Sequence, residues 1–236
     1  MKTETIIQII SVLISLIAPI FFYRILNEAI KKSNISSSLK LKSNGFLFIG
    51  LSFWVSLVYF MTLSDVFAYN PNEQFPRFLI GLFTPVTIVL LLFSNSTFRT
   101  VLDNTSYKYL AEGQLWRILG VVFFLIAISG IGPKGFISSG IGDVTTALIA
   151  EITVWSLIKR VKWSKLSMWA LIAFGVTDLL VVLFILITKY PIWNETVPST
   201  AMAGSFPMML IIGIAAPIAL LQHVFMIRKL ILGHRA

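Results

Sequence analysis

The chain has 236 residues, of which 57% are hydrophobic and only 12% are charged, and its mean hydropathy is +0.88. Soluble domains are about 45–50% apolar and about 25% charged, so this composition excludes a soluble globular protein. The absence of cysteine excludes disulfides and thiolate metal sites. The net charge of +9 would suggest nucleic acid in a soluble protein. Here the basic residues fall in short loops, where they act as orientation signals facing anionic lipid, and no nucleic-acid motif is present.

Apolar runs of the length of a membrane span occur throughout the chain. A span needs about 20 mostly apolar residues, and no window alternates with period two as barrel strands do. The first run continues to Ile25, which is too long for the h-region of a signal peptide, so we expect a retained span. The sequence predicts a single all-α domain over residues 1–236, a transmembrane bundle of seven helices at about residues 5–27, 45–64, 77–98, 114–132, 140–159, 167–188 and 206–228.

The basic residues predict the orientation of this bundle. Lys2, Arg77, Lys134 and Lys189 fall on one side of the predicted spans, whereas the other fifteen of the 19 Lys and Arg residues, Arg235 among them, fall on the opposite side. The positive-inside rule then places the N-terminus outside and the C-terminus in the cytoplasm. We expect a multi-pass protein of a bacterial inner membrane, surrounded by the lipid bilayer. The sequence indicates neither its oligomeric state nor a protein partner.

Ionisable groups inside the spans are the main candidates for function, because they are expensive in a membrane. With a rise of 1.5 Å per residue, Glu151 and Asp178 are expected near the midplane and Asp143 about 10 Å toward the outside. On the same arithmetic a further group lies about 9–15 Å toward the cytoplasm. The predicted ladder therefore has Asp143 outside, two acids in the middle, and an inner layer of Asn95, Gln114, Arg117, Gln222 and His223.

Each of these residues also has a purely structural interpretation. Arg117 either extends to the cytoplasmic headgroups or forms an internal pair with Asp178 or a network with Gln222 and His223. His223 is either a neutral, hydrogen-bonded residue between helices or a titrating group. Asp143, expected at the start of its helix, is either favoured there by the macrodipole or belongs to the ladder.

The string Gly140-Ile-Gly-Asp143 resembles the Gly-x-Gly-Asp motif of intramembrane aspartyl proteases. That resemblance implies a second catalytic aspartate, for which Asp65 and Asp178 are the candidates. Two departures count against it, because Thr145 stands where prepilin peptidases have lysine and the Pro-Ala-Leu signature of presenilin-like proteases is missing.

The topology resembles that of microbial rhodopsins, but the last span has no lysine before Lys229 to hold retinal. A broader resemblance is carried by Gln114-Leu-Trp-Arg117, the Gly-x-Gly-Asp string, Gly175-Val-Thr-Asp178 and Leu221-Gln-His223. In these motifs the chain is similar to a family of uncharacterised bacterial seven-helix membrane proteins. That resemblance implies the architecture and a polar core but no activity.

The leading functional hypothesis is a protein that binds or conducts a small solute, an ion or a proton through a polar cavity within the membrane. The alternatives are the aspartyl protease and a sensor or assembly partner without catalysis. No cofactor, metal or catalytic residue is expected under the leading hypothesis, and the predicted polar core consists of Gln114, Arg117, Asp143, Glu151, Asp178, Gln222 and His223.

Overall fold

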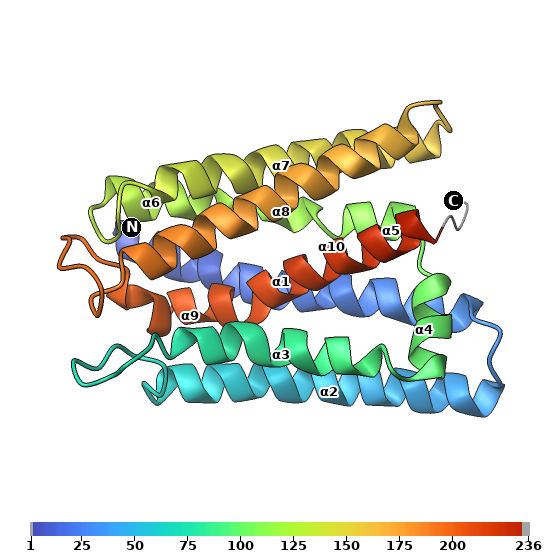
Figure 1. Cartoon of the computed structure of the whole chain (residues 1–236), viewed down its shortest axis with the longest axis horizontal. Helices are drawn as coiled ribbons and strands as arrows, with labels where there is room; N and C mark the ends of the chain where they lie inside the picture. Colours follow the sequence, from blue (N-terminus) through green and yellow to red (C-terminus); the bar gives the residue numbers. More distant parts are fainter. Residues whose placement is uncertain (1, 233–236) are drawn as a thin grey trace.

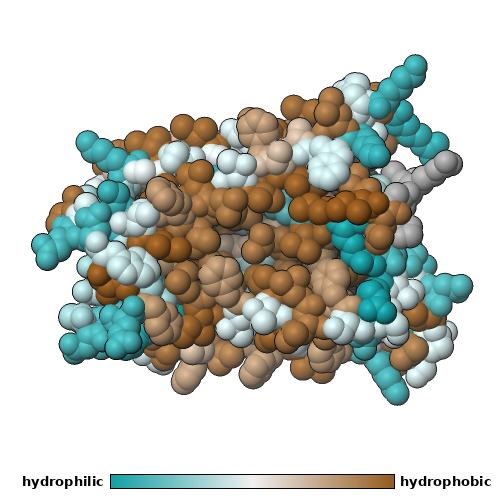
Figure 2. Space-filling view, in the orientation of Figure 1, coloured by the Kyte–Doolittle hydropathy of each residue, from teal (hydrophilic) through white to brown (hydrophobic). Residues whose placement is uncertain are grey.

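The computed structural model describes residues 2–232, and the regular structure within that range is helical, with no strand. The long helices run side by side along the long axis of the molecule, and the start of α1 and the end of α10 lie at opposite ends (Figure 1). Hydrophilic side chains gather at the two ends, and hydrophobic side chains cover the band between them (Figure 2). This distribution suits a helical bundle that crosses a bilayer, because only the ends of such a bundle meet water. The chain is therefore a multi-pass, all-helical membrane protein.

Within residues 2–232, six helical segments are long and apolar enough to cross a membrane. They are α1 (Thr3–Lys32), α2 (Ser37–Leu63), the segment Tyr107–Ile128, α7 (Phe136–Ile158), α8 (Ser164–Thr188) and the segment Met208–Ile231. A seventh span exists only if α3 (Phe78–Leu92) and α4 (Ser96–Asp103) are counted together, although they meet at a bend of 99°.

The bend between α3 and α4 corrects the prediction of one helix over residues 77–98. The side chain of Asn95 accepts a hydrogen bond from the backbone N–H of Phe98 at 3.0 Å and so caps a new helix. Only Val101 and Leu102 of α4 are buried, which fits a short amphipathic helix across the end of the bundle (Figure 1). Asn95 is thus a helix cap and not a member of the inner polar layer.

The segment Tyr107–Ile128 is made of α5 (Tyr107–Glu112), the 3₁₀ helix η1 (Leu115–Val121) and α6 (Val122–Ile128). The predicted start at Gln114 is wrong, because the chain is already helical from Tyr107. A search for apolar residues misses α5, because α5 contains Lys108 and Glu112, which form an ion pair at 3.5 Å. The earlier start moves the midpoint of the span to Arg117.

The segment Met208–Ile231 is the most buried candidate span. It contains α9 (Met208–Leu210), the π-helical turn η3 (Ile211–Ala215) and α10 (Ala216–Ile231). Pro217 has no N–H to donate to the carbonyl of Gly213, and the indole Nε1 of Trp54 in α2 donates to that carbonyl at 3.0 Å. The carbonyl that lacks its helical hydrogen bond is therefore satisfied by a side chain of a neighbouring helix, as backbone polar groups within a membrane must be.

The loop after α2 packs against the loop between α8 and the short 3₁₀ helix η2 (Ala201–Gly204). Tyr190 is fully buried there, and its O–H donates to the carboxylate of Glu73 at 2.5 Å. Burial, together with this hydrogen bond to Glu73, raises the pKa of Tyr190 above its ordinary value, so the phenol keeps its proton. The ring also packs edge-on against Tyr69 and Phe78. This cluster locks the two loops together at one end of the bundle.

Candidate functional site

Arg117 lies at the centre of the bundle with a side chain that is 0% exposed. It comes from η1, in the middle of the segment Tyr107–Ile128. With a rise of 1.5 Å per residue, Arg117 is about 1 Å from the midpoint of its span and Asp178 about 3 Å from the midpoint of α8. The full burial of the Arg117 side chain does not fit extension to the headgroups, and Arg117 lies near the midpoint of its span rather than about 9–15 Å from it.

The guanidinium of Arg117 binds two carboxylates at once. Its Nε donates to Oδ1 of Asp143 at 2.6 Å, and one terminal nitrogen donates to Asp178. Asp143 comes from α7 and Asp178 from α8, so one side chain joins three helical segments. Because α7 begins at Phe136 rather than at Gly140, Asp143 lies two turns inside its helix, and the interpretation as a helix-start residue is wrong.

The other terminal nitrogen of Arg117 faces His223 and Gln114. It lies 3.3 Å from Nε2 of His223 and donates to Oε1 of Gln114 at 3.4 Å. Because arginine has only donors, Nε2 of His223 is the acceptor, and the proton of the neutral ring is on Nδ1. That Nδ1 is buried and has no hydrogen-bond partner among the described residues.

Gln222 completes the cluster from α10. Nε2 of Gln114 donates to Oε1 of Gln222 at 2.5 Å, and both side chains are fully buried. The structure thus brings together six of the seven residues that the sequence singled out. They meet in one network and not in separate layers: Gln114, Arg117, Asp143, Asp178, Gln222 and His223.

Glu151 is the exception, and its predicted inward orientation is wrong. It is exposed on the surface of the bundle, whereas Ala150 beside it is fully buried. The buried face of α7 follows Ser139, Asp143 and Thr146 to Ala150. Since successive residues turn by about 100° around a helix, Glu151 points away from that face.

Glycines make the close approaches of this cluster possible. A Cβ at Gly120 would collide with the side chain of Asp143, and one at Gly142 with that of Asp178. A Cβ at Gly175 would collide with the ring of His223 and lie 3.1 Å from a terminal nitrogen of Arg117. Glycine at these positions lets neighbouring helices approach until the charged groups touch. Gly120 was not recognised from the sequence as part of the site, because its role depends on which helix lies opposite.

A cavity of about 110 Å³ borders the cluster. Arg117, Asp143 and Asp178 are the charged groups among its lining residues, and most of the remaining lining is aliphatic or aromatic. The volume has room for several water molecules. Trp116 also lines the cavity, and within residues 2–232 its buried indole Nε1 has no hydrogen-bond partner. Trp116 lies within the motif Gln114-Leu-Trp-Arg117, but the sequence does not distinguish it from other aromatic residues of a span.

The formal charge of the cluster is not balanced. One guanidinium faces two carboxylates, which leaves one negative charge when both acids are ionised and His223 is neutral. An uncompensated charge in a low-dielectric interior is strongly unfavourable. In that charge state, one carboxylate charge of the cluster has no counter-charge in the ion pairs of the described residues. The described residues contain no group of His, Cys, Asp and Glu suited to a bound metal ion.

Comparison with known proteins adds a family but no activity. A family model described as a domain of unknown function, DUF8737, matches residues 75–231, a range that starts before α3 and contains every residue of the cluster. No curated protein and no solved structure matches the chain. The match covers more than half of the 236 residues, and the chain belongs to the DUF8737 family.

Proposed function

We propose that this protein binds a proton or small cation at the Arg117 cluster and conducts it across the membrane through the adjoining cavity. The observation that carries this proposal is the single guanidinium shared by two buried carboxylates, Asp143 and Asp178, beside a cavity at mid-depth. Ionisable groups placed there are a hallmark of ion and proton pathways. A bound proton or small cation would neutralise the one negative charge that Arg117 leaves uncompensated, and this favours its binding.

Hydroxyl groups on α7 extend the polar path on both sides of Asp143. Ser139 and Thr146 lie four residues before and three residues after it, on the same buried face. Both hydroxyls are without a hydrogen-bond partner among the described residues. Farther along, Ser156 and Ser167 share a buried hydrogen bond at 2.9 Å. Water molecules between such hydroxyls would supply the links that a proton needs, because waters bridge polar groups that are too far apart to bond directly.

The orientation of the protein is part of the proposal. The distribution of Lys and Arg favours a cytoplasmic location for the end of the bundle that contains α4 and the end of α10. Arg117 no longer counts toward that distribution because it lies at mid-depth, and Arg235 lies outside the described residues. The Lys and Arg residues that remain on the inner side still outnumber the four on the outer side. In this orientation Asp143 lies on the outer half of α7 and His223 on the inner half of the segment Met208–Ile231.

The geometry does not favour the aspartyl protease. Such enzymes rely on two carboxylates that share one proton. Here Asp143 and Asp178 each bond to the guanidinium of Arg117, and no hydrogen bond among the described residues joins the two acids to each other. Asp65, the other candidate, lies just after the end of α2, outside the cluster.

We expect proton flux into proteoliposomes, followed with an enclosed pH-sensitive dye under an imposed membrane potential, to depend on Asp178. Replacing Asp178 by Asn should reduce the protein-dependent flux at least tenfold, because the remaining carboxylate is then neutralised by Arg117 alone. The matched control is Glu151→Gln, which removes an exposed carboxylate from the same membrane region. Equal flux through the wild-type and Asp178→Asn proteins, or no flux of protons or monovalent cations through the wild-type protein, would refute the proposal.

A further inference from the structure

A second polar site lies at the end of the bundle where α10 ends, away from the Arg117 cluster. Here a pocket of about 720 Å³ is bordered by the last turns of α1, α7 and α10 and by the loop between α4 and α5. We call it the basic pocket, because four of its lining residues are cationic and only Asp103 is acidic: Lys32, Lys108, Arg160 and Lys229.

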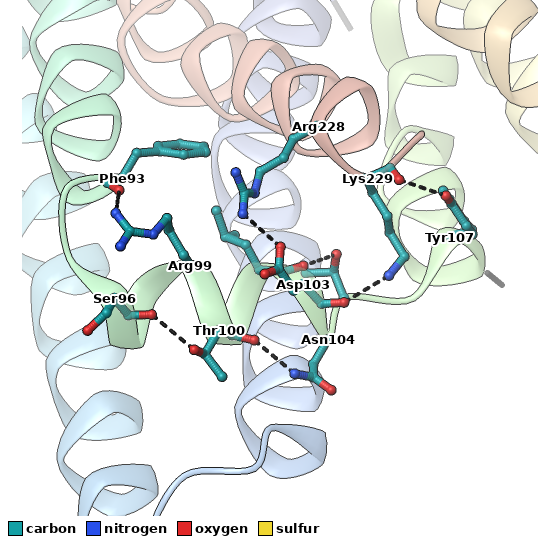
Figure 3. A network of polar contacts seen from close by, with 11 residues as sticks. Phe93, Ser96, Arg99, Thr100, Asp103, Asn104, Tyr107, Arg228 and Lys229 are labelled. Carbon is teal, nitrogen blue, oxygen red and sulfur yellow. Dashed lines mark hydrogen bonds and ion pairs between the residues drawn. The ribbon is translucent and has the colours of Figure 1, made fainter. Parts of the chain in front are cut away.

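Nearby groups hold Lys229 in place at the wall of the basic pocket. Its Nζ donates to the backbone carbonyl of Asp103 at 3.0 Å and lies 5.1 Å from the centre of the Tyr107 ring. The O–H of Tyr107 donates in turn to the carbonyl of Lys229 at 3.0 Å. Figure 3 shows the side chain of Lys229 between Asp103 and Tyr107, close to the end of α4. These contacts fix the position of the Lys229 ammonium at the wall of the pocket, and the residue as a whole is only 7% exposed.

The one acid of the basic pocket is outnumbered by its cations. The carboxylate of Asp103 forms an ion pair with Arg228 at 2.9 Å (Figure 3), and Arg228 does not line the pocket. Lys108 has a carboxylate partner in Glu112, whereas no ion pair within residues 2–232 involves Lys32 or Arg160. The pocket thus presents a surplus of positive charge to whatever enters it.

The backbone conformation of Arg160 is a second observation that supports a role for the positive charge of the basic pocket. It follows α7 at φ 52°, in the left-handed region that glycine adopts most easily. The N–H of Val161 donates to the carbonyl of Ser156 at 3.1 Å, and the N–H of Arg160 to that of Leu157 at 3.3 Å. These are the two bonds of a Schellman motif, whose left-handed position is usually glycine. Arginine at this position places a guanidinium at the pocket despite an unfavourable backbone conformation.

We propose that the basic pocket binds a phosphoryl anion. Lysine ammonium groups and an arginine fork are the donors that recognise phosphate oxygens, and the hydroxyl of Ser106 adds a neutral donor to the lining. Leu157 and Ile158 form an apolar wall, which suits the glycerol and acyl root of an anionic phospholipid. A soluble phosphate compound offers the same oxygens without the apolar part, so the two sources share one chemistry.

Two binding measurements on the purified full chain distinguish these sources. In the first, the protein in phospholipid-free, uncharged detergent is titrated with inorganic pyrophosphate. In the second, the protein in nanodiscs of phosphatidylcholine is compared with the protein in nanodiscs containing phosphatidylglycerol, and bound anionic lipid is counted by native mass spectrometry. Binding in the first measurement indicates a soluble phosphate compound, and selective retention in the second indicates a lipid headgroup.

The variant Arg160→Gly tests the site without threatening the fold, because glycine fits the left-handed position better than arginine does. Its melting temperature should equal or exceed that of the wild type, and its affinity for the bound probe should fall about tenfold, as expected for the loss of one charge-assisted contact. Lys162→Ala is the matched control, since Lys162 carries the same charge in the same loop but does not line the pocket. Equal losses in the two variants, an unchanged affinity in Arg160→Gly, or no binding of either probe to the wild type would overturn the proposal.

Discussion

Replacing Arg117 by methionine is expected to lower the free energy of unfolding by about 3–5 kcal/mol, the usual result of removing one partner from a buried ion pair. The substitution leaves Asp143 and Asp178 without their shared cation and removes the donor that faces His223. The effect comes mainly from the stranded carboxylates rather than from lost packing, because methionine fills much of the same space. Unfolding by sodium dodecyl sulfate in mixed micelles, followed by circular dichroism, measures the change.

Two further variants separate this cause from general damage. Arg24→Met removes an arginine whose side chain is 57% exposed and lies 3.9 Å from Glu112, and a surface pair of this kind contributes at most about 1 kcal/mol. The triple variant Arg117→Met, Asp143→Asn, Asp178→Asn should recover most of the lost stability, because no buried charge is then left unpaired. If Arg117→Met is as stable as Arg24→Met, or if the triple variant is no better than Arg117→Met alone, then the ion pairs do not hold these helices together.

Replacing Gly142 by alanine is expected to displace Asp178 from Arg117. The added Cβ would collide with the carboxylate oxygen and Cγ of Asp178, so the acid must move or α7 and α8 must separate. Overpacking of a tight interior costs about 1–3 kcal/mol, and the weakened ion pair adds to that cost. The melting temperature in detergent should fall, and proton flux should fall with it.

Gly50→Ala provides the comparison for this substitution. Gly50 lies within α2, and no atom lies within 4 Å of its added Cβ. Alanine there should stabilise the protein by about 0.5–1 kcal/mol, because glycine is the poorer helix former. The two substitutions add the same methyl group but should shift the melting temperature in opposite directions. A Gly142→Ala protein that melts like Gly50→Ala would contradict the close contact between α7 and Asp178.

The helical, membrane-spanning character of the chain followed from composition, because twenty apolar residues in a row have few other uses. The ends and bends of the helices did not follow so directly. The start of the segment around Arg117 was missed because Lys108 and Glu112 are charged. The end of α3 was missed because Asn95 caps a new helix inside an apolar run. In both places a local polar contact, an ion pair in one and a helix cap in the other, outweighed the average hydropathy of the window.

The sequence predicted which residues form the polar core more accurately than how those residues are arranged. Arg117 was correctly linked to Asp178 as one alternative, but its second partner, Asp143, was assigned to a different layer because the helix limits set the estimated depths. Glu151 was placed inward from its estimated depth and its rotation of about 80° from Asp143, whereas packing leaves that side of α7 exposed. The approaches at Gly120 and Gly175 depend on which helices are neighbours, and a single sequence does not specify this.

Infrared difference spectroscopy during a pH change tests most directly whether the cluster around Arg117 takes up one proton. Acidification of the wild-type protein should produce the carbonyl stretching band of a protonated, buried carboxylic acid, and Glu151→Gln should show the same band. In Asp178→Asn and in Asp143→Asn this band should be absent, because the single remaining carboxylate is already balanced by Arg117. A band that persists unchanged in both Asn variants, or that disappears in Glu151→Gln, would contradict proton binding at this cluster.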